Sequence, residues 1–257
     1  MTLSLRTVLP ALALTASLCA QPAPPLTHVA IFKVKPDKIT QWVQLTQKVY
    51  VPTLDKLLAE GTLLAYGVDT DILHRADEPN ASAWFAVPNY AAYQKVEEAV
   101  AKAQAANAGY MVGLREMMDD DDHFDLLLRS HFGNRKSPPK GALPYTSISL
   151  FKAKPGKSPE VAKVLEQLFK PLFDPLVASG DLFSYSLESE TQHSQPGALY
   201  LVASMPSLAS MDKLDAAFAA ILSKGDGGKS FTQAMTELTE VEAHRDYIMR
   251  AHSFASR

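Results

Sequence analysis

The sequence predicts an α+β fold made of two tandem copies of one β-α-β-β-α-β unit. The first observation behind this prediction is an internal repeat, because residues 31–38 (IFKVKPDK) match residues 150–157 (LFKAKPGK) at an offset of 119. The second is that each copy alternates β-rich runs with apolar stripes at helical spacing. The 257-residue chain is 47% hydrophobic and 21% charged, which is a globular composition.

The first strand and first helix of each copy follow from local patterns. Residues 27–35 are β-rich and predict the first strand. An apolar stripe over residues 39–58 predicts a helix, and residues 161–176 repeat that stripe in the second copy. Pro52 and Pro171 are expected to kink or split these helices, since proline removes a backbone donor.

Two further strands, a helical region and a closing strand complete each copy. In the first copy the two strands are expected at residues 62–74 and 81–87, joined by a polar loop. Residues 89–118 are mostly helical in pattern, with a break near Gly109. The closing strand is expected at residues 123–132.

This order of elements is the ferredoxin-like plan. On that order, and on the patterns at residues 32–36 and 61–66, the chain resembles the dimeric α/β-barrel superfamily, which includes the antibiotic-biosynthesis monooxygenase, NIPSNAP, EthD and stress-responsive barrel families. The resemblance implies that two units place their sheets face to face, with the closing strand of one near the second strand of the other. Two tandem units in one chain therefore imply an intramolecular dimeric α/β barrel, a self-contained pseudo-dimer. No catalytic motif specific to one of these families matches.

The repeat and the N-terminal pattern predict the domain organisation. Residues 1–20 are interpreted as a signal peptide, 21–26 as a Pro-rich spacer, 27–132 as the first ferredoxin-like repeat, 133–144 as a linker and 145–257 as the second repeat. The signal peptide predicts a periplasmic or secreted location. Anchoring as a lipoprotein is less favoured, because the bulky Leu18 precedes Cys19.

Composition and motifs exclude several classes of function. With 25 Lys and Arg against 28 Asp and Glu, the chain lacks the basic excess that nucleic-acid binding needs. No segment after residue 20 is apolar enough to cross a bilayer. Cleavage after Ala20 would leave no cysteine, which excludes disulfide and thiolate chemistry. The sequence also lacks the glycine motifs of nucleotide binding and the familiar hydrolase motifs.

The closing strands of the two copies share one polar pattern, H-x-D-x-[LI]-x-R-x-H. It contains the eight candidate catalytic residues His123, Asp125, Arg129, His131, His244, Asp246, Arg250 and His252. Because side chains alternate across a strand, these residues lie on one face. The other face is apolar, so we expect it to pack on the helices and the polar face to look into the barrel or out at its mouth. There the imidazoles would act as acids or bases, and the arginines would bind an anion or oxyanion.

Four residues of the second strands are candidate ligand-binding residues: Tyr66, His74, Tyr185 and His193. In each copy the phenol and the imidazole are eight residues apart and therefore share one face of a strand. Together they would orient a polar substrate or move a proton. Core packing is the alternative interpretation for the two tyrosines, since buried tyrosine is ordinary core material.

The closing-strand pattern has two other interpretations. The aspartates and arginines would form structural ion pairs across the barrel while the histidines cap strand ends. Alternatively, His123 and Asp125 lie about 6.6 Å apart along a strand, at a rise of ~3.3 Å per residue, and could share a metal ion with a third ligand. Because H-x-D alone is a weak signal, we predict no metal site.

We expect an exported protein that binds a small organic molecule in the barrel cavity. If the protein is an enzyme, the resemblance implies cofactor-independent monooxygenation, isomerisation or a related proton transfer. A non-catalytic binding or interaction module is the second hypothesis, and a haem or metal protein that uses the paired histidines is the third. The sequence requires no cofactor.

Overall fold

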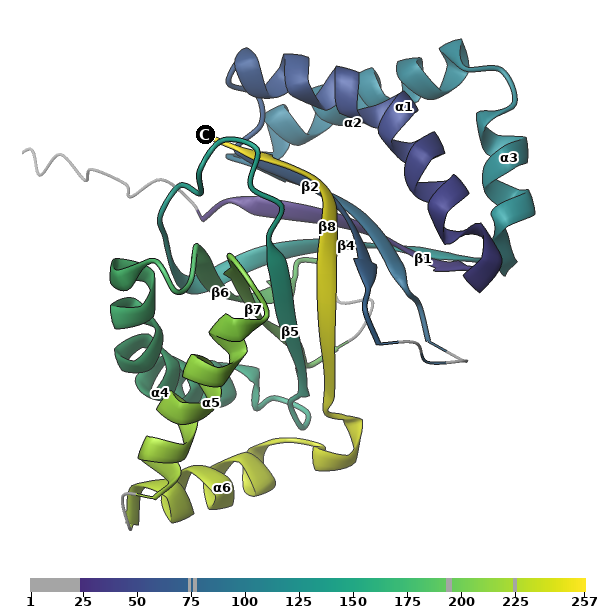
Figure 1. Ribbon diagram of the computed structural model, residues 1–257. Coiled ribbons are helices and arrows are strands. Elements are labelled where there is room, and N and C mark those ends of the chain that lie inside the picture. The colour runs from purple at the N-terminus through teal and green to yellow at the C-terminus, as the bar shows by residue number, and fades with distance from the viewer. Residues whose placement is uncertain (1–23, 74, 76–77, 193–195, 224–225) are drawn as a thin grey trace, which may run out of the picture.

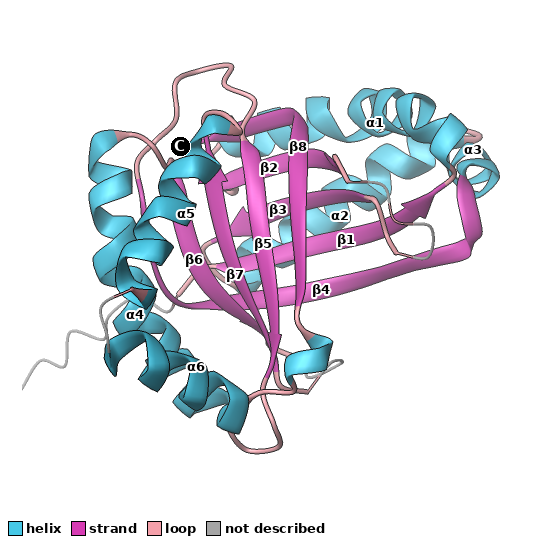
Figure 2. Ribbon diagram, turned by 60° about the horizontal axis from the view of Figure 1, so that its bottom comes forward, coloured by secondary structure: helices cyan, strands magenta, loops and turns pink. Residues whose placement is uncertain are grey.

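The computed structural model describes residues 24–73, 75, 78–192, 196–223 and 226–257, so the expected signal peptide lies outside the described residues. Within this part of the chain, eight strands form one closed antiparallel barrel with helices on its outside (Figures 1 and 2). The α+β barrel that the sequence predicts is confirmed.

Among the described residues, each half contains four strands and three α-helices. The strands are β1 (Leu26–Val34), β2 (Ala65–Asp71), β3 (Ala81–Val87), β4 (Met118–Arg135), β5 (Tyr145–Lys152), β6 (Ser184–Glu190), β7 (Ala198–Met205) and β8 (Arg245–Ser256). The helices are α1 (Ile39–Ala59), α2 (Tyr90–Ala106), α3 (Tyr110–Met117), α4 (Ser158–Ser179), α5 (Ala209–Leu222) and α6 (Asp226–Leu238). We call β1–β4 with α1–α3 the first half, and β5–β8 with α4–α6 the second half.

The last strand of each half joins the two halves. Around the barrel the strands follow the order β1-β3-β2-β8-β5-β7-β6-β4. β4 pairs with β1 of its own half and with β6 of the other half, and β8 pairs in the same way with β5 and β2. This crossing is the arrangement that the resemblance implies for the closing strands. The descriptions of each half as a ferredoxin-like unit and of the chain as a pseudo-dimer stay predictions.

Apolar side chains form cores on both sides of the barrel wall. Inside the barrel, Leu126 and Leu128 of β4 belong to one buried cluster with Ala198 and Tyr200 of β7, from the other half. Outside it, α1–α3 cover the first half and α4–α6 cover the second half (Figure 1). The wall strands therefore have two buried faces, one toward the interior and one toward the helices.

The helices follow the predicted pattern, and of the two expected effects of the prolines, a kink or a split, the split does not occur. α1 continues through Pro52 and α4 through Pro171, so neither helix is split. The packing of α1 explains this continuity, because Val49 and Leu54, on either side of the proline, are both buried against the barrel. The helical region of the first half is divided as expected at Gly109, whose φ of +86° favours glycine.

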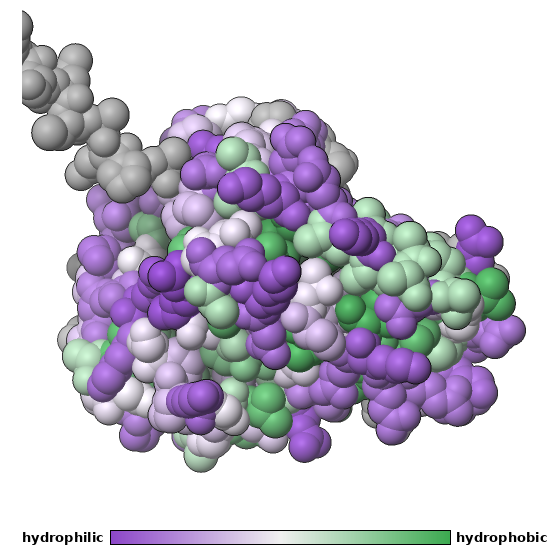
Figure 3. All heavy atoms as spheres, turned by 90° about the horizontal axis from the view of Figure 1, so that it is seen from above, coloured by the Kyte–Doolittle hydropathy of each residue, from purple (hydrophilic) through white to green (hydrophobic). Residues whose placement is uncertain are grey.

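The closing strand of the first half is longer than its pattern predicts. β4 extends through Arg135, three residues into the expected linker, because residues 133–135 pair with residues 184–186 of β6. Seen from above, the surface mixes hydrophilic and hydrophobic side chains (Figure 3). No helix in the described part of the chain combines the length and the apolar character needed to cross a membrane.

Candidate functional site

The polar pattern of the closing strands faces the helix layer, so the predicted orientation is wrong. On β4, Leu126 belongs to the interior cluster, whereas Leu127 packs with the cluster under α1 and α2. His123, Asp125 and Arg129 alternate in phase with Leu127 and share its face. In the second half, the His244 ring lies 4.8 Å from the ring of Phe151, which packs against the cluster under α4, so the β8 pattern begins with the same orientation.

The closed barrel explains this reversal. Its interior is enclosed by eight strands, so the apolar face of each closing strand points there. The helices cover only part of the outside, and the polar face stays partly accessible: the Asp125 side chain is 50% exposed and that of Asp246 is 60% exposed. The alternation of polar and apolar residues along a strand could not show whether its apolar face packs in the barrel interior or against the helices.

Asp125 lies between two histidines on this outer face. Its Oδ1 is 3.2 Å from His123 Nε2 and 3.4 Å from His28 Nε2 of β1. Burial raises the pKa of Asp125, but the hydrogen bonds from both histidines outweigh it and hold that pKa below its ordinary value. The bond to Asp125 raises the pKa of His123. Arg129 instead places its guanidinium 5.7 Å from the ring centre of Tyr90 on α2.

The second half repeats this arrangement with different partners. Asp246 Oδ2 lies 3.1 Å from His244 Nε2, and its Oδ1 accepts a hydrogen bond of 2.6 Å from Ser149. Asp125 thus lies against a histidine of its own strand and Asp246 against the histidine that precedes β8, which differs from the Asp–Arg ion pairs that the sequence allows. Among the described residues, no group of three His, Cys, Asp or Glu side chains is arranged to hold a metal ion.

His131 and His252 lie at matched irregularities of the closing strands. The register of β4 against β6 shifts between Ser130 and Phe132, and β2 pairs with residues 251 and 253 of β8 but skips residue 252. Each histidine is therefore the extra residue of a β-bulge, a feature that re-aims a side chain.

Each of these two histidines contacts a hydroxyl on the neighbouring strand. His131 Nε2 is 2.8 Å from Ser189 Oγ, and His252 Nε2 is 2.8 Å from Thr70 Oγ1. Burial lowers the pKa of both histidines, and Arg250 lowers that of His252 further. Both imidazoles are therefore mainly neutral at pH 7.

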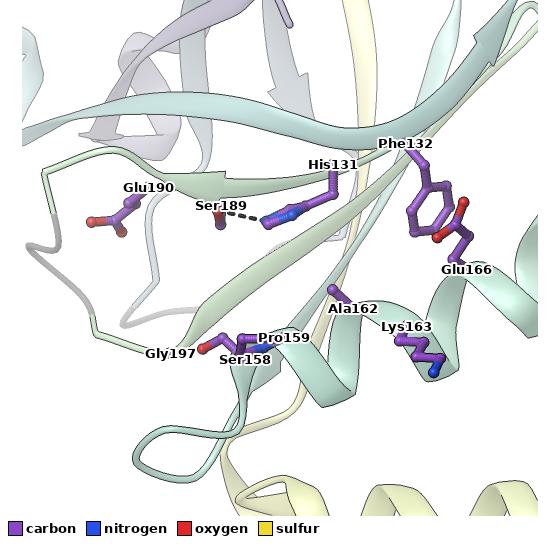
Figure 4. Close-up of a pocket in the computed structure, with 10 residues that line it drawn as sticks. All are labelled: His131, Phe132, Ser158, Pro159, Ala162, Lys163, Glu166, Ser189, Glu190 and Gly197. Atoms are coloured by element: carbon purple, nitrogen blue, oxygen red, sulfur yellow. Dashed lines mark hydrogen bonds between the residues drawn. The ribbon is translucent and has the colours of Figure 1, made fainter.

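A cavity of about 370 Å³ lies between α4 and the outer face of the barrel (Figure 4). It is lined by His131, Phe132, Ser158, Pro159, Ala162, Lys163, Glu166, Ser189, Glu190 and Gly197. Of the predicted site residues that the structure describes, only His131 lines it. The volume is in the range of sites for small organic molecules.

The matched region of the first half is closed by a glutamine. Gln47 of α1 donates from Nε2 to the His252 carbonyl at 2.9 Å and to Ser253 Oγ at 3.0 Å. At the repeat offset of 119, Gln47 corresponds to Glu166, which lines the cavity of the second half. Gln47 is thus bonded to the closing strand β8 in the first half, whereas its counterpart Glu166 lines a cavity in the second half.

The tyrosines proposed as ligand-binding residues are engaged by the helices. Tyr66 donates to Asp55 of α1 and Tyr185 donates to Asp174 of α4, each at 2.6 Å. Both rings are buried, so these residues tie a strand to a helix, as the core-packing alternative expects. The two histidines proposed beside them, at positions 74 and 193, lie outside the described residues.

Sequence reasoning missed a pair of buried carboxyl groups, Asp69 and Glu188. They occupy matched positions on β2 and β6. Burial raises the pKa of Asp69 to about 7, although Trp84 Nε1 donates to its Oδ2 at 2.5 Å, and burial also raises the pKa of Glu188. Gly67 allows the Trp84 contact, since a Cβ there would lie 2.5 Å from the indole nitrogen. The sequence did hold a signal for this pair, because the two carboxyl residues are separated by the repeat offset of 119.

Comparisons with known proteins identify the fold. No protein-family model and no curated protein matches the chain. A solved structure of a candidate monooxygenase from Fusobacterium nucleatum matches with a TM-score of 0.68 and 12% identity, over 92% of this chain and 96% of that chain. A candidate monooxygenase from Lactobacillus acidophilus matches with a TM-score of 0.62 and 10% identity, over 91% and 96% of the two chains.

A structure described as a haem-binding protein from Thermus thermophilus is also similar. Its TM-score is 0.52 at 8% identity, over 90% of this chain and 92% of that chain. At 8–12% identity these likenesses support the barrel fold alone.

Proposed function

We propose that this protein binds a small, partly apolar organic molecule in the cavity at His131, and that His131 accepts or donates a proton there without a cofactor. One observation carries the proposal: a histidine that the sequence singles out lines a cavity of ligand size. The proposed binding place therefore moves from the barrel interior to the outer face of the barrel under α4.

The cavity lining supports both binding and proton transfer. Phe132, Pro159 and Ala162 offer apolar surface to a ligand. The lowered pKa of His131 keeps its ring neutral at pH 7, so the ring can accept a proton from an acidic O–H or C–H group. The hydroxyl of Ser189, 2.8 Å from Nε2, fixes the orientation of the ring.

The reaction class follows from what a neutral imidazole can do. Removal of a proton from a substrate is a step shared by isomerisation and by oxygenation without a cofactor. The descriptions of two similar structures as candidate monooxygenases are compatible with such a step. We therefore assign proton abstraction to His131 and leave the non-catalytic binding module as the competing outcome of the test.

Haem is the cofactor that one similar structure is described as binding. In this cavity the Nε2 atom of His131 already faces Ser189, and the exposed charged residues Lys163 and Glu166 lie on the helix wall. Charged side chains on this wall and a volume of about 370 Å³ favour a ligand smaller than a porphyrin.

Acetophenone is a suitable probe, because it combines an aromatic ring with an acidic C–H group beside a carbonyl. We expect the wild-type protein to bind it and to accelerate exchange of its methyl hydrogens for deuterium in D2O. His131→Ala should abolish the exchange, whereas the matched variant His252→Ala should retain it within about twofold. Mass spectrometry measures the exchange, and circular dichroism controls for folding of both variants.

Three results would overturn parts of this proposal. Equal exchange by wild type and His131→Ala removes the proton-transfer role. Binding without exchange in the wild type supports the non-catalytic module instead. A Soret absorbance band in protein purified from its native source would replace the proposal with the haem hypothesis.

A further inference from the structure

The two halves share the histidine–hydroxyl pair but differ at the helix positions that face it. At the repeat offset, Lys163 and Glu166 of α4 replace Gln44 and Gln47 of α1. On the closing strand, Phe132 replaces Ser253, in the position that follows the histidine in the shared pattern. The cavity beside His131 is therefore lined by two charged helix residues and an aromatic ring, whereas the matched positions around His252 hold two glutamines and a serine.

These replacements explain why space exists beside His131. In the first half, Gln47 acts as a donor and closes the region by binding the His252 carbonyl and the Ser253 hydroxyl. The carboxylate of Glu166 has no hydrogen to donate to the matched carbonyl, and phenylalanine offers no hydroxyl. Glu166 therefore cannot make the two contacts that Gln47 makes in the first half.

The negative charge of Glu166 lies on the side of the cavity that holds the Phe132 ring (Figure 4). Figure 4 shows Glu166 rising from α4 toward the ring of Phe132, whereas Lys163 points away from His131. His131 is mainly neutral at pH 7, because burial lowers its pKa. A carboxylate beside an aromatic face attracts a cation through both the charge and the π-system.

We propose that the ligand of this cavity is a small organic amine, whose protonated nitrogen binds between the Glu166 carboxylate and the Phe132 ring. Glu166 is then the residue that selects a cation over a neutral or anionic ligand, because its carboxylate is negative and can only accept hydrogen bonds. This inference rests on the proposed function, since it names the class of molecule that the His131 cavity takes. An anion such as a carboxylate would be repelled by Glu166 and is selected against.

Three probes of similar size and different charge test the inference: benzylamine, benzyl alcohol and benzoate. Their dissociation constants are measured at pH 7.5 and low salt by isothermal titration. We expect benzylamine to bind about five- to tenfold more tightly than benzyl alcohol, the gain typical of a partly exposed ion pair with an aromatic contact. Benzoate should bind more weakly than both.

Variants on one helix provide the control. Glu166→Gln introduces the residue that the first half carries at this position, and it should reduce benzylamine binding to the level of benzyl alcohol while leaving benzyl alcohol unchanged. Glu160→Gln makes the same change of charge on α4 at a residue outside the cavity lining, and it should alter benzylamine binding less than twofold.

The outcomes separate this inference from the proposed function. If the three probes bind equally, or if Glu166→Gln weakens all three alike, the amine assignment is wrong while binding at His131 stands. If benzoate binds most tightly, the inference is also wrong, because the cavity then selects anions. If none of the three probes binds, both the amine assignment and the proposal of a binding site at His131 are wrong.

Discussion

The two halves of the molecule differ in how they surround the same histidine. His131 and His252 occupy matched bulges, and each contacts a hydroxyl at 2.8 Å. Thr70 beside His252 is buried, and Gln47 closes that region, whereas Ser189 and His131 line a cavity. The two halves thus share the histidine–hydroxyl pair but differ around it. The helix position holds Gln47 in one half and Glu166 in the other, and the strand position after the histidine holds Ser253 or Phe132.

The largest expected effect concerns the matched buried carboxyl groups of the two halves. The pKa of Asp69 is about 7 in the folded protein, against an ordinary value of 3.8. The folded state therefore holds a proton that the unfolded chain releases between pH 4 and pH 7, and stability falls as pH rises through this window. The full penalty above pH 7 is roughly 4 kcal/mol.

Asp69→Asn should remove this penalty and keep an oxygen for the Trp84 N–H. Urea unfolding at pH 4 and pH 8 measures the difference between variant and wild type, which we expect to grow in favour of the variant as pH rises. Glu188→Gln should behave in the same direction, because burial also raises the pKa of Glu188. A difference that is constant with pH would show that these carboxyl groups are not protonated in the fold.

The strand-to-helix hydrogen bonds provide the next comparison. Tyr66→Phe deletes the bond to Asp55 and should lower the free energy of unfolding by about 1–2 kcal/mol. Tyr185→Phe should have a smaller effect, about 0.5–1 kcal/mol, because Asp174 keeps hydrogen bonds from Asn134 and Lys170. Equal losses in urea unfolding would mean that those two partners do not compensate.

The smallest expected effect distinguishes the electrostatics of the two bulge histidines. Arg250 contributes to the lowered pKa of His252, whereas burial alone lowers the pKa of His131. Arg250→Gln should therefore raise the pKa of His252 toward its ordinary value, and the matched Arg129→Gln should leave that of His131 unchanged. Imidazole NMR titrations measure both, and a shift of His131 in Arg129→Gln would contradict the assignment.

The repeat in the sequence predicted much of the fold. It placed equivalent strands, helices and tyrosines in both halves, and the H-x-D-x-[LI]-x-R-x-H pattern identified His131. Alternation could not predict which face of β4 points inward, because apolar side chains of β4 pack on both faces, Leu126 in the interior cluster and Leu127 against the helix-side cluster. Nor could it predict the bulges at His131 and His252, which depend on pairing with strands of the opposite half.

The cavity was also beyond sequence reasoning. Gln47 and Glu166 occupy equivalent helix positions, and only the structure shows that Gln47 bonds to β8 whereas Glu166 lines the cavity. The buried Asp69 and Glu188 were overlooked for a related reason. A carboxylate on a strand is usually solvated, and only the closed barrel shows that these two are enclosed.

The most direct test of the central claim is a titration of acetophenone into the protein while the imidazole resonances of His131 and His252 are followed together by NMR. The matched bulges make His252 an internal control in the same sample. We predict saturable shifts of the His131 resonances and unchanged His252 resonances. Equal shifts of both histidines, or shifts of His252 alone, would contradict the assignment of the functional site to the second half.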